Sequence, residues 1–133
     1  SRPFPSIALV EGIPDFIMAH YFILREQASD CEKTDARCAP VAMLGSSSPI
    51  DAEALPHFKD KKVRIFVHAD KAGGKAAVRW ANQIKEYTGH VDYMRFDGLM
   101  QVGASPVEDL YDYFKLDFSL LPGGEDNYRR IMP

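Results

Sequence analysis

Short β-forming runs alternate four times with helical runs along this chain, and this alternation constrains the fold more than any other feature of the sequence. The predicted strands are the apolar-rich runs at residues 6–10, 40–44, 62–67 and 91–96. The predicted helices cover residues 14–27, 51–58, 71–88 and 107–114. Gly89 is expected to end the third helix as its C′ residue. Such alternation is typical of a parallel sheet covered by helices, so we predict an α/β protein with a mainly parallel four-stranded sheet flanked by helices.

Size and composition limit the chain to one core. Its 133 residues are 46% hydrophobic and 26% charged, which is near the globular average. We expect one domain over residues 1–116, followed over 117–133 by a C-terminal tail or the start of a linker. The net charge of −3 argues against a polycation for nucleic acid, although a local basic strip stays compatible with it.

The cellular context is predicted from what the sequence lacks. No run approaches 18 apolar residues, so no membrane partner is expected. The first residues lack an initiator Met and a signal-peptide core, so we expect a piece of a longer protein. Cys31 and Cys38 have no further ligands nearby for zinc, and we interpret them as loop thiols in a reducing compartment, the cytoplasm.

Acidic side chains and one histidine follow several predicted strands. Glu11 follows the first strand, and His68 and Asp70 follow the third. Further acids come later in the chain, at Asp97, Glu108, Asp109 and Asp112. In parallel sheets, ligands bind beyond the carboxyl ends of the strands.

Gathered carboxylates favour a metal site. At about 5 Å each pair repels by roughly 3 kcal/mol, and a divalent cation relieves that repulsion. Carboxylate ligands point to Mg²⁺ or Mn²⁺. A single Asp is more often a helix cap, but Glu11 and Asp70 together favour a site for phosphate chemistry.

A cationic stripe begins beside these acids. Lys71, Lys75 and Arg79 recur every four residues and therefore share one face of the third predicted helix. Next to a metal site, such a stripe would hold a phosphate backbone or a nucleoside triphosphate. The alternative is an ordinary solvated helix face.

Two segments together resemble the Toprim domain, the catalytic module of bacterial-type primases, type IA and type II topoisomerases and old-type nucleases. They are residues 8–15 (ALVEGIPD) and residues 66–73 (FVHADKAG), which follow the family pattern of strand, Glu-Gly, later strand, Asp-x-Asp and Gly. Residues 43–46 (MLGS) are similar to the strand-and-glycine turn of that fold, and residues 107–112 (VEDLYD) are similar to the Lys-Asp-x-Asn-Asp-type segment of primase and primase-helicase members. The resemblance covers roughly residues 6–115 and implies the Rossmann-like Toprim fold.

The resemblance also implies site residues. In the family the Asp-x-Asp pair holds Mg²⁺, and the glutamate acts as acid/base or as a further metal contact. Glu11 and Asp70 are therefore the expected catalytic residues and metal ligands, with Asp109 and Asp112 as further metal contacts. His68 replaces the first acid of the pair, and imidazole prefers softer ions than Mg²⁺. It would ligate Mn²⁺, contact a phosphate, or mark a site without full activity.

The function implied by the resemblance is metal-dependent nucleotidyl transfer in a primase-like DNA replication protein. Its partners would be a DNA template, nucleoside triphosphates and other domains of the parent protein, with a helicase as a candidate. The family's zinc ribbon and basic flanking subdomain are not in these 133 residues, so we expect the isolated chain to be inactive. Two alternatives stay open: a degenerate Toprim module that binds nucleic acid or proteins, and a nuclease that uses the same acids.

Overall fold

The computed structural model describes residues 4–29, 38–117, 131 and 133. The first half of the chain contains β1 (Ser6–Glu11), α1 (Ile13–Ser29), β2 (Cys38–Met43) and the 3-10 helix η1 (Leu55–Phe58). The second half contains β3 (Lys62–Val67), α2 (Lys71–Ile84), β4 (Val91–Arg95), β5 (Met100–Gln101), β6 (Ser105–Pro106) and α3 (Leu110–Tyr113).

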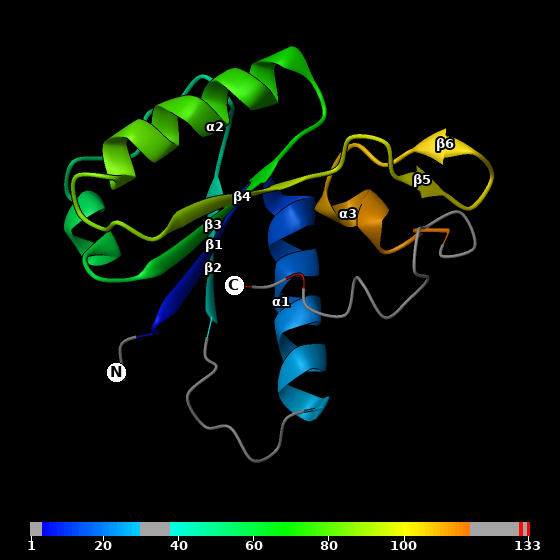
Figure 1. Cartoon of the computed structure of the whole chain (residues 1–133), viewed down its shortest axis with the longest axis horizontal. Coiled ribbons are helices and arrows are strands. Elements are labelled where there is room, and N and C mark those ends of the chain that lie inside the picture. Colours follow the sequence, from blue (N-terminus) through cyan, green and yellow to red (C-terminus); the bar gives the residue numbers. More distant parts are fainter. Residues whose placement is uncertain (1–3, 30–37, 118–130, 132) are drawn as a thin grey trace.

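The first four strands form one parallel sheet in the order β2-β1-β3-β4. Helix α1 connects β1 to β2, and α2 connects β3 to β4, so each helix belongs to one βαβ unit. Figure 1 shows α1 on one face of the sheet and α2 on the other. The predicted α/β, Rossmann-like architecture is therefore confirmed, with the strand order reversing between β1 and β3.

Alternate residues of the central strands pack on opposite faces of the sheet. Ala8 and Val10 lie in the cluster that includes the buried side of α1, whereas Ile7 and Leu9 lie in the cluster beneath α2. This is the period of two that a β-strand imposes on its side chains. Both faces of β1 are buried, as expected for a central strand of a parallel sheet.

Helix α2 has one buried face and one charged face. Its buried residues are Gly73, Ala76, Ala77, Trp80, Ala81 and Ile84. The Trp80 ring is 1% exposed, and its Nε1–H donates to the carbonyl oxygen of Ser48 at 2.8 Å. Lys71, Lys75 and Arg79 are exposed on the other side, so the predicted separation of the two faces is confirmed.

Two predicted helices are shorter than expected. Helix α2 ends at Ile84 rather than at residue 88, because the N–H groups of Tyr87 and Thr88 both donate to the Ile84 carbonyl and the regular helical pattern stops there. The predicted role of Gly89 is wrong, because its φ is not positive. The helix predicted over residues 51–58 is only the turn η1, in which Pro56 offers no backbone N–H.

The segment after β4 differs most from its prediction. Strands β5 and β6 form a small antiparallel hairpin that the sequence pattern did not reveal. The Val107 N–H donates to the carbonyl of Leu99, and the backbone of Asp109 is extended, with φ −150° and ψ −179°. Helix α3 therefore begins at Leu110, capped by Asp109, and not at residue 107.

Other predictions receive only partial tests. No helix among the residues described is long and apolar enough to cross a bilayer. The prediction that Cys38 is a loop thiol is wrong, because it is the buried first residue of β2, and burial raises the pKa of its thiol to about 12. Cys31 lies outside the described residues. Of the predicted tail, residues 118–130 and 132 also lie outside them, while Ile131 belongs to the core cluster on the α1 side.

Candidate functional site

The carboxyl ends of β1 and β3 meet where the strand order of the sheet reverses. Helices leave neighbouring strands toward opposite faces there, which opens a crevice beyond the strand ends. Glu11 is the last residue of β1, and His68 directly follows β3. The fold therefore brings these two predicted residues to the position where open α/β sheets bind ligands.

The junction from β1 to α1 depends on a glycine. Gly12 has a φ of +82°, a left-handed conformation that side chains disfavour. Its N–H donates to the Met43 carbonyl and its carbonyl accepts from Phe16, so it ends β1 and opens α1. Asp15 consequently lies in the first turn of α1, where the helix dipole favours a negative charge.

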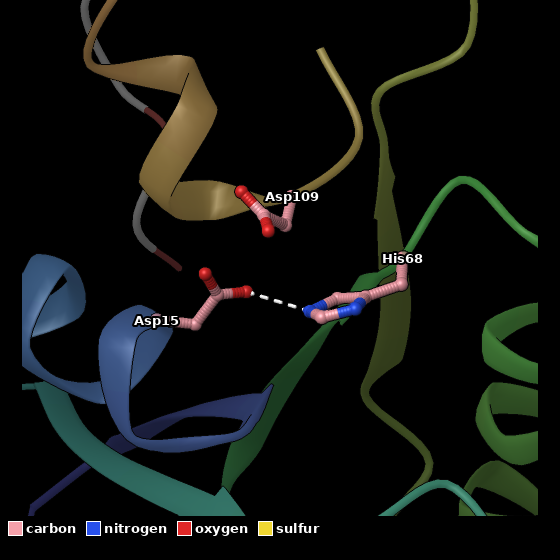
Figure 2. A group of neighbouring side chains, drawn as sticks. All are labelled: Asp15, His68 and Asp109. Atoms are coloured by element: carbon pink, nitrogen blue, oxygen red, sulfur yellow. Dashed lines mark hydrogen bonds and ion pairs between the residues drawn. The ribbon is translucent and has the colours of Figure 1, made fainter.

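Asp15 is a buried carboxylate at the centre of the site. Its side chain is 2% exposed and accepts backbone hydrogen bonds from Leu110 at 3.3 Å and Tyr111 at 3.0 Å. Its Oδ2 atom also lies 2.9 Å from Nε2 of His68 (Figure 2). Three partners thus compensate a charge that would otherwise be costly to bury.

His68 lies between two carboxylates. Its Nε2 faces Asp15, and its Nδ1 lies 3.7 Å from Oε2 of Glu11. The hydrogen bond to Asp15 is the largest cause that raises the pKa of His68, to about 9, against the opposing effect of burial. The ring is therefore an imidazolium at neutral pH and offsets part of the negative charge around it.

Asp109 reaches the site from α3. It caps α3 by accepting from the Asp112 N–H at 2.8 Å, and Figure 2 shows its carboxylate beside Asp15 and His68. Burial raises the pKa of Asp109, and the nearby charges of Asp15 and Asp112 raise it further. The segment is tied to the end of β3, because Ala69 N–H donates to the Glu108 carbonyl at 2.8 Å.

The junction from β3 to α2 also requires a glycine, for close packing. A Cβ on Gly73 would lie 2.6 Å from the carbonyl oxygen of His68 and 2.7 Å from its Cβ. Its hydrogen therefore lets the first turn of α2 approach the backbone of His68. Asp70 is the exposed N-cap of this helix, and its carboxylate accepts from the Gly73 N–H at 2.5 Å.

A pocket of about 200 Å³ opens beside His68. It is lined by Val67, His68, Ala69, Asp70, Lys71, Gly74, Arg95 and Asp97. Lys71 and Arg95 contribute positive charge, although the Arg95 guanidinium also pairs with Asp97 at 2.8 Å. Of the three predicted cationic residues, Lys71 is the one that lines this pocket.

The other predicted site residues lie farther from Asp15, His68 and Asp109, or form hydrogen bonds with the backbone. Asp112 accepts from the Glu108 N–H and supports the turn that carries Asp109. Lys75 and Arg79 continue along the exposed face of α2, so Arg79 lies roughly 12 Å along the helix from Lys71. The Arg79 guanidinium donates to the Ser46 carbonyl at 2.9 Å, which ties it to the loop after β2.

Three of these side chains can hold a metal ion. One donor atom each from Asp15, His68 and Asp109 lies within 4.8 Å of the other two. Of the predicted metal ligands, Asp109 belongs to this group, whereas Glu11, Asp70 and Asp112 lie outside it, and Asp15 was not among the predicted site residues. Its signal was present in the sequence, since it follows the Glu-Gly pair by three residues in a helix that starts at the same strand end.

No family model matches this chain, and no curated protein matches it either. Its function is therefore inferred from the fold, the site and the motifs.

Proposed function

We propose that this chain is a Toprim-like module of a primase-like replication protein and supports metal-dependent nucleotidyl transfer in the full-length protein. One observation carries the proposal: at the reversal point of the sheet, His68 lies between Glu11 and Asp15, and Asp109 joins Asp15 and His68. Three of these four residues were singled out from the motifs alone. The DNA template, the nucleoside triphosphates and further domains, with a helicase as a candidate, belong to this proposal.

Asp15, His68 and Asp109 would hold the metal, which we propose to be Mg²⁺ or Mn²⁺. A divalent ion supplies neutralisation of phosphate charge during phosphoryl chemistry. Two of the three donors are carboxylates, and this fits such an ion. The imidazolium must give up its proton before Nε2 can serve as a ligand.

The remaining side chains would act on the substrate. Glu11 faces the second ring nitrogen of His68 and is half-buried, so it is suited to take a proton or to orient the ring. Lys71 and Arg95, which line the pocket, would steady phosphate groups there. Asp70 borders the same pocket and would complete the metal environment once phosphate is bound.

A binding role without chemistry is the second candidate, and the charge on His68 favours it. The imidazolium places a positive charge among the carboxylates, where it compensates them without an ion. Such a module would hold phosphate through its cationic groups and leave catalysis to other domains. The two candidates make opposite predictions for Glu11.

The test compares Glu11→Gln with the matched control Glu86→Gln, an exposed residue near the far end of α2. Primer synthesis and phosphodiester hydrolysis are assayed with single-stranded DNA, nucleoside triphosphates and Mg²⁺ or Mn²⁺, in the longest protein that carries this chain. We expect Glu11→Gln to lose activity and keep DNA binding, while the control keeps both. Activity unchanged by Glu11→Gln would support the binding role, and hydrolysis without synthesis would support the nuclease.

A further inference from the structure

We propose that His68 makes this metal site prefer divalent transition-metal ions that accept imidazole nitrogen over Mg²⁺, and this inference rests on the metal-binding part of the proposed function. The site is the Asp15–His68–Asp109 group, in which one donor of the three is a nitrogen. Mg²⁺ favours oxygen ligands in octahedral geometry, whereas Mn²⁺ and Co²⁺ accept imidazole readily. The identity of residue 68 thus decides the preferred ion.

The positions of the donor atoms suit one shared ion. Nε2 of His68 lies 2.9 Å from Oδ2 of Asp15, and a carboxylate oxygen of Asp109 completes a group within 4.8 Å. Ligands about 2.0–2.2 Å from an ion lie about 3–4 Å from one another, so small side-chain movements bring all three to it. Figure 2 shows that the three side chains point toward a common space from β3, α1 and the start of α3.

The surroundings of His68 resemble those that orient metal-binding histidines. A metal-ligating imidazole usually presents its other ring nitrogen to a carboxylate, which fixes the tautomer and the ring plane. Here Nδ1 lies 3.7 Å from Oε2 of Glu11, while Nε2 faces the other donors. This contact is longer than a hydrogen bond, so Glu11 would position the ring after a small side-chain movement.

The two carboxylate donors are held in place as well. Asp15 accepts from the N–H groups of Leu110 and Tyr111, and Asp109 accepts from the Asp112 N–H. Hydrogen bonds of this kind fix ligating carboxylates before an ion arrives. The backbone of His68 is fixed by the close approach of Gly73. All three donors are thus oriented without help from an ion.

The proposal is tested by calorimetric titration of the chain with Mg²⁺, Mn²⁺ and Co²⁺, without DNA or nucleotide. A Cys31→Ser background removes the thiol that lies outside the described residues. We expect affinity to rise from Mg²⁺ through Mn²⁺ to Co²⁺. In His68→Asp, the ratio of Co²⁺ to Mg²⁺ affinity should fall by at least about tenfold. The ratio is the decisive quantity, because the added carboxylate changes the affinity for every divalent ion.

Two variants serve as controls. His57→Asp makes the same substitution at an exposed position and should leave the ratio unchanged. Asp109→Asn replaces a charged carboxylate donor by a neutral amide oxygen and should weaken all three ions alike, so the ratio is preserved. Proton NMR gives a second readout, since Co²⁺ bound to Nε2 shifts the signals of the His68 ring.

The outcomes separate this inference from the proposed function. An unchanged ratio in His68→Asp, or no Co²⁺ binding to the parent chain at millimolar concentration, overturns the inference. A ratio that falls as expected, combined with no nucleotidyl transfer under any ion, supports the inference and overturns the proposed function. Mg²⁺-dependent nucleotidyl transfer, combined with an unchanged ratio of Co²⁺ to Mg²⁺ affinity in His68→Asp, supports the proposed function and overturns the inference.

Discussion

The junction from β1 to α1 and the junction from β3 to α2 both bring an aspartate to the carboxyl edge of the sheet. Asp15 is buried and accepts from His68 and from the two backbone N–H groups at the start of α3. Asp70 is exposed. Among the described residues, its carboxylate accepts one hydrogen bond, from the Gly73 N–H, and this bond caps its own helix. Similar positions in the chain therefore give one carboxylate a long-range role and the other a local one.

The segment after β6 causes this difference. Residues 107–113 pack over the first junction, where the Val107, Leu110 and Tyr113 side chains enter the same cluster as α1. This packing removes Asp15 from water and supplies its partners. The second junction faces the open pocket instead. A carboxylate at a strand end thus acquires its role from the segments that cover it.

The largest effect is expected for Asp15→Ala. It leaves two backbone N–H groups and the His68 imidazolium without their acceptor, so stability should fall by about 3–5 kcal/mol. Asp70→Ala removes only a helix cap and should cost about 1 kcal/mol. Urea unfolding followed by circular dichroism measures both. Equal losses in the two variants would show that burial does not distinguish these carboxylates.

The charge on His68 should make stability depend on pH. Its pKa is raised from 6.5 in the unfolded chain to about 9 in the folded one, chiefly by the hydrogen bond to Asp15. This contribution is complete below about pH 6.5 and is lost as the pH rises through about 9, by up to about 3 kcal/mol. Urea midpoints measured between these values provide the check. His68→Gln should flatten the dependence, whereas Asp70→Asn should leave its slope in place.

Two adjacent glycines provide a matched pair at the second junction. Gly73→Ala would place a methyl group against the backbone of His68 and should destabilise the chain by about 1–3 kcal/mol. Gly74→Ala meets nothing within 4 Å inside a helix, so it should stabilise by about 0.5–1 kcal/mol. Thermal unfolding measures both changes. Opposite signs are expected, and two changes of the same sign would contradict the close approach at Gly73.

The smallest effect concerns Glu11. Its Oε2 lies 3.7 Å from Nδ1 of His68 and contributes to the raised pKa less than Asp15 does. Glu11→Gln should therefore lower the pKa of His68 by less than about 1 unit, because much of this attraction is screened by water. NMR titration of the ring protons follows the change. A larger fall would mean that Glu11, and not Asp15, holds the charge on the ring.

Much of the architecture could be predicted from local patterns. The apolar run at residues 62–67 and the four-residue spacing of Lys71, Lys75 and Arg79 indicated β3 and the two faces of α2 correctly. These features depend on side-chain periodicity and burial, which neighbouring residues determine. The strands of the β5–β6 hairpin have two residues each, which is too short for an alternation that a pattern could reveal, and α2 ends where the Tyr87 and Thr88 N–H groups share the Ile84 carbonyl.

The sequence by itself determined the alternating elements and the presence of Glu11, His68 and Asp109 near the ends of strands or the start of a helix. The tertiary structure decided which of them meet, and it added Asp15 to the group. The reason is that the strand order places β1 beside β3, while α3 covers one junction and leaves the other open. Strand order and covering contacts join residues far apart in the chain, such as Asp15 and Tyr111 at a separation of 96 positions, and local spacing does not encode such distances.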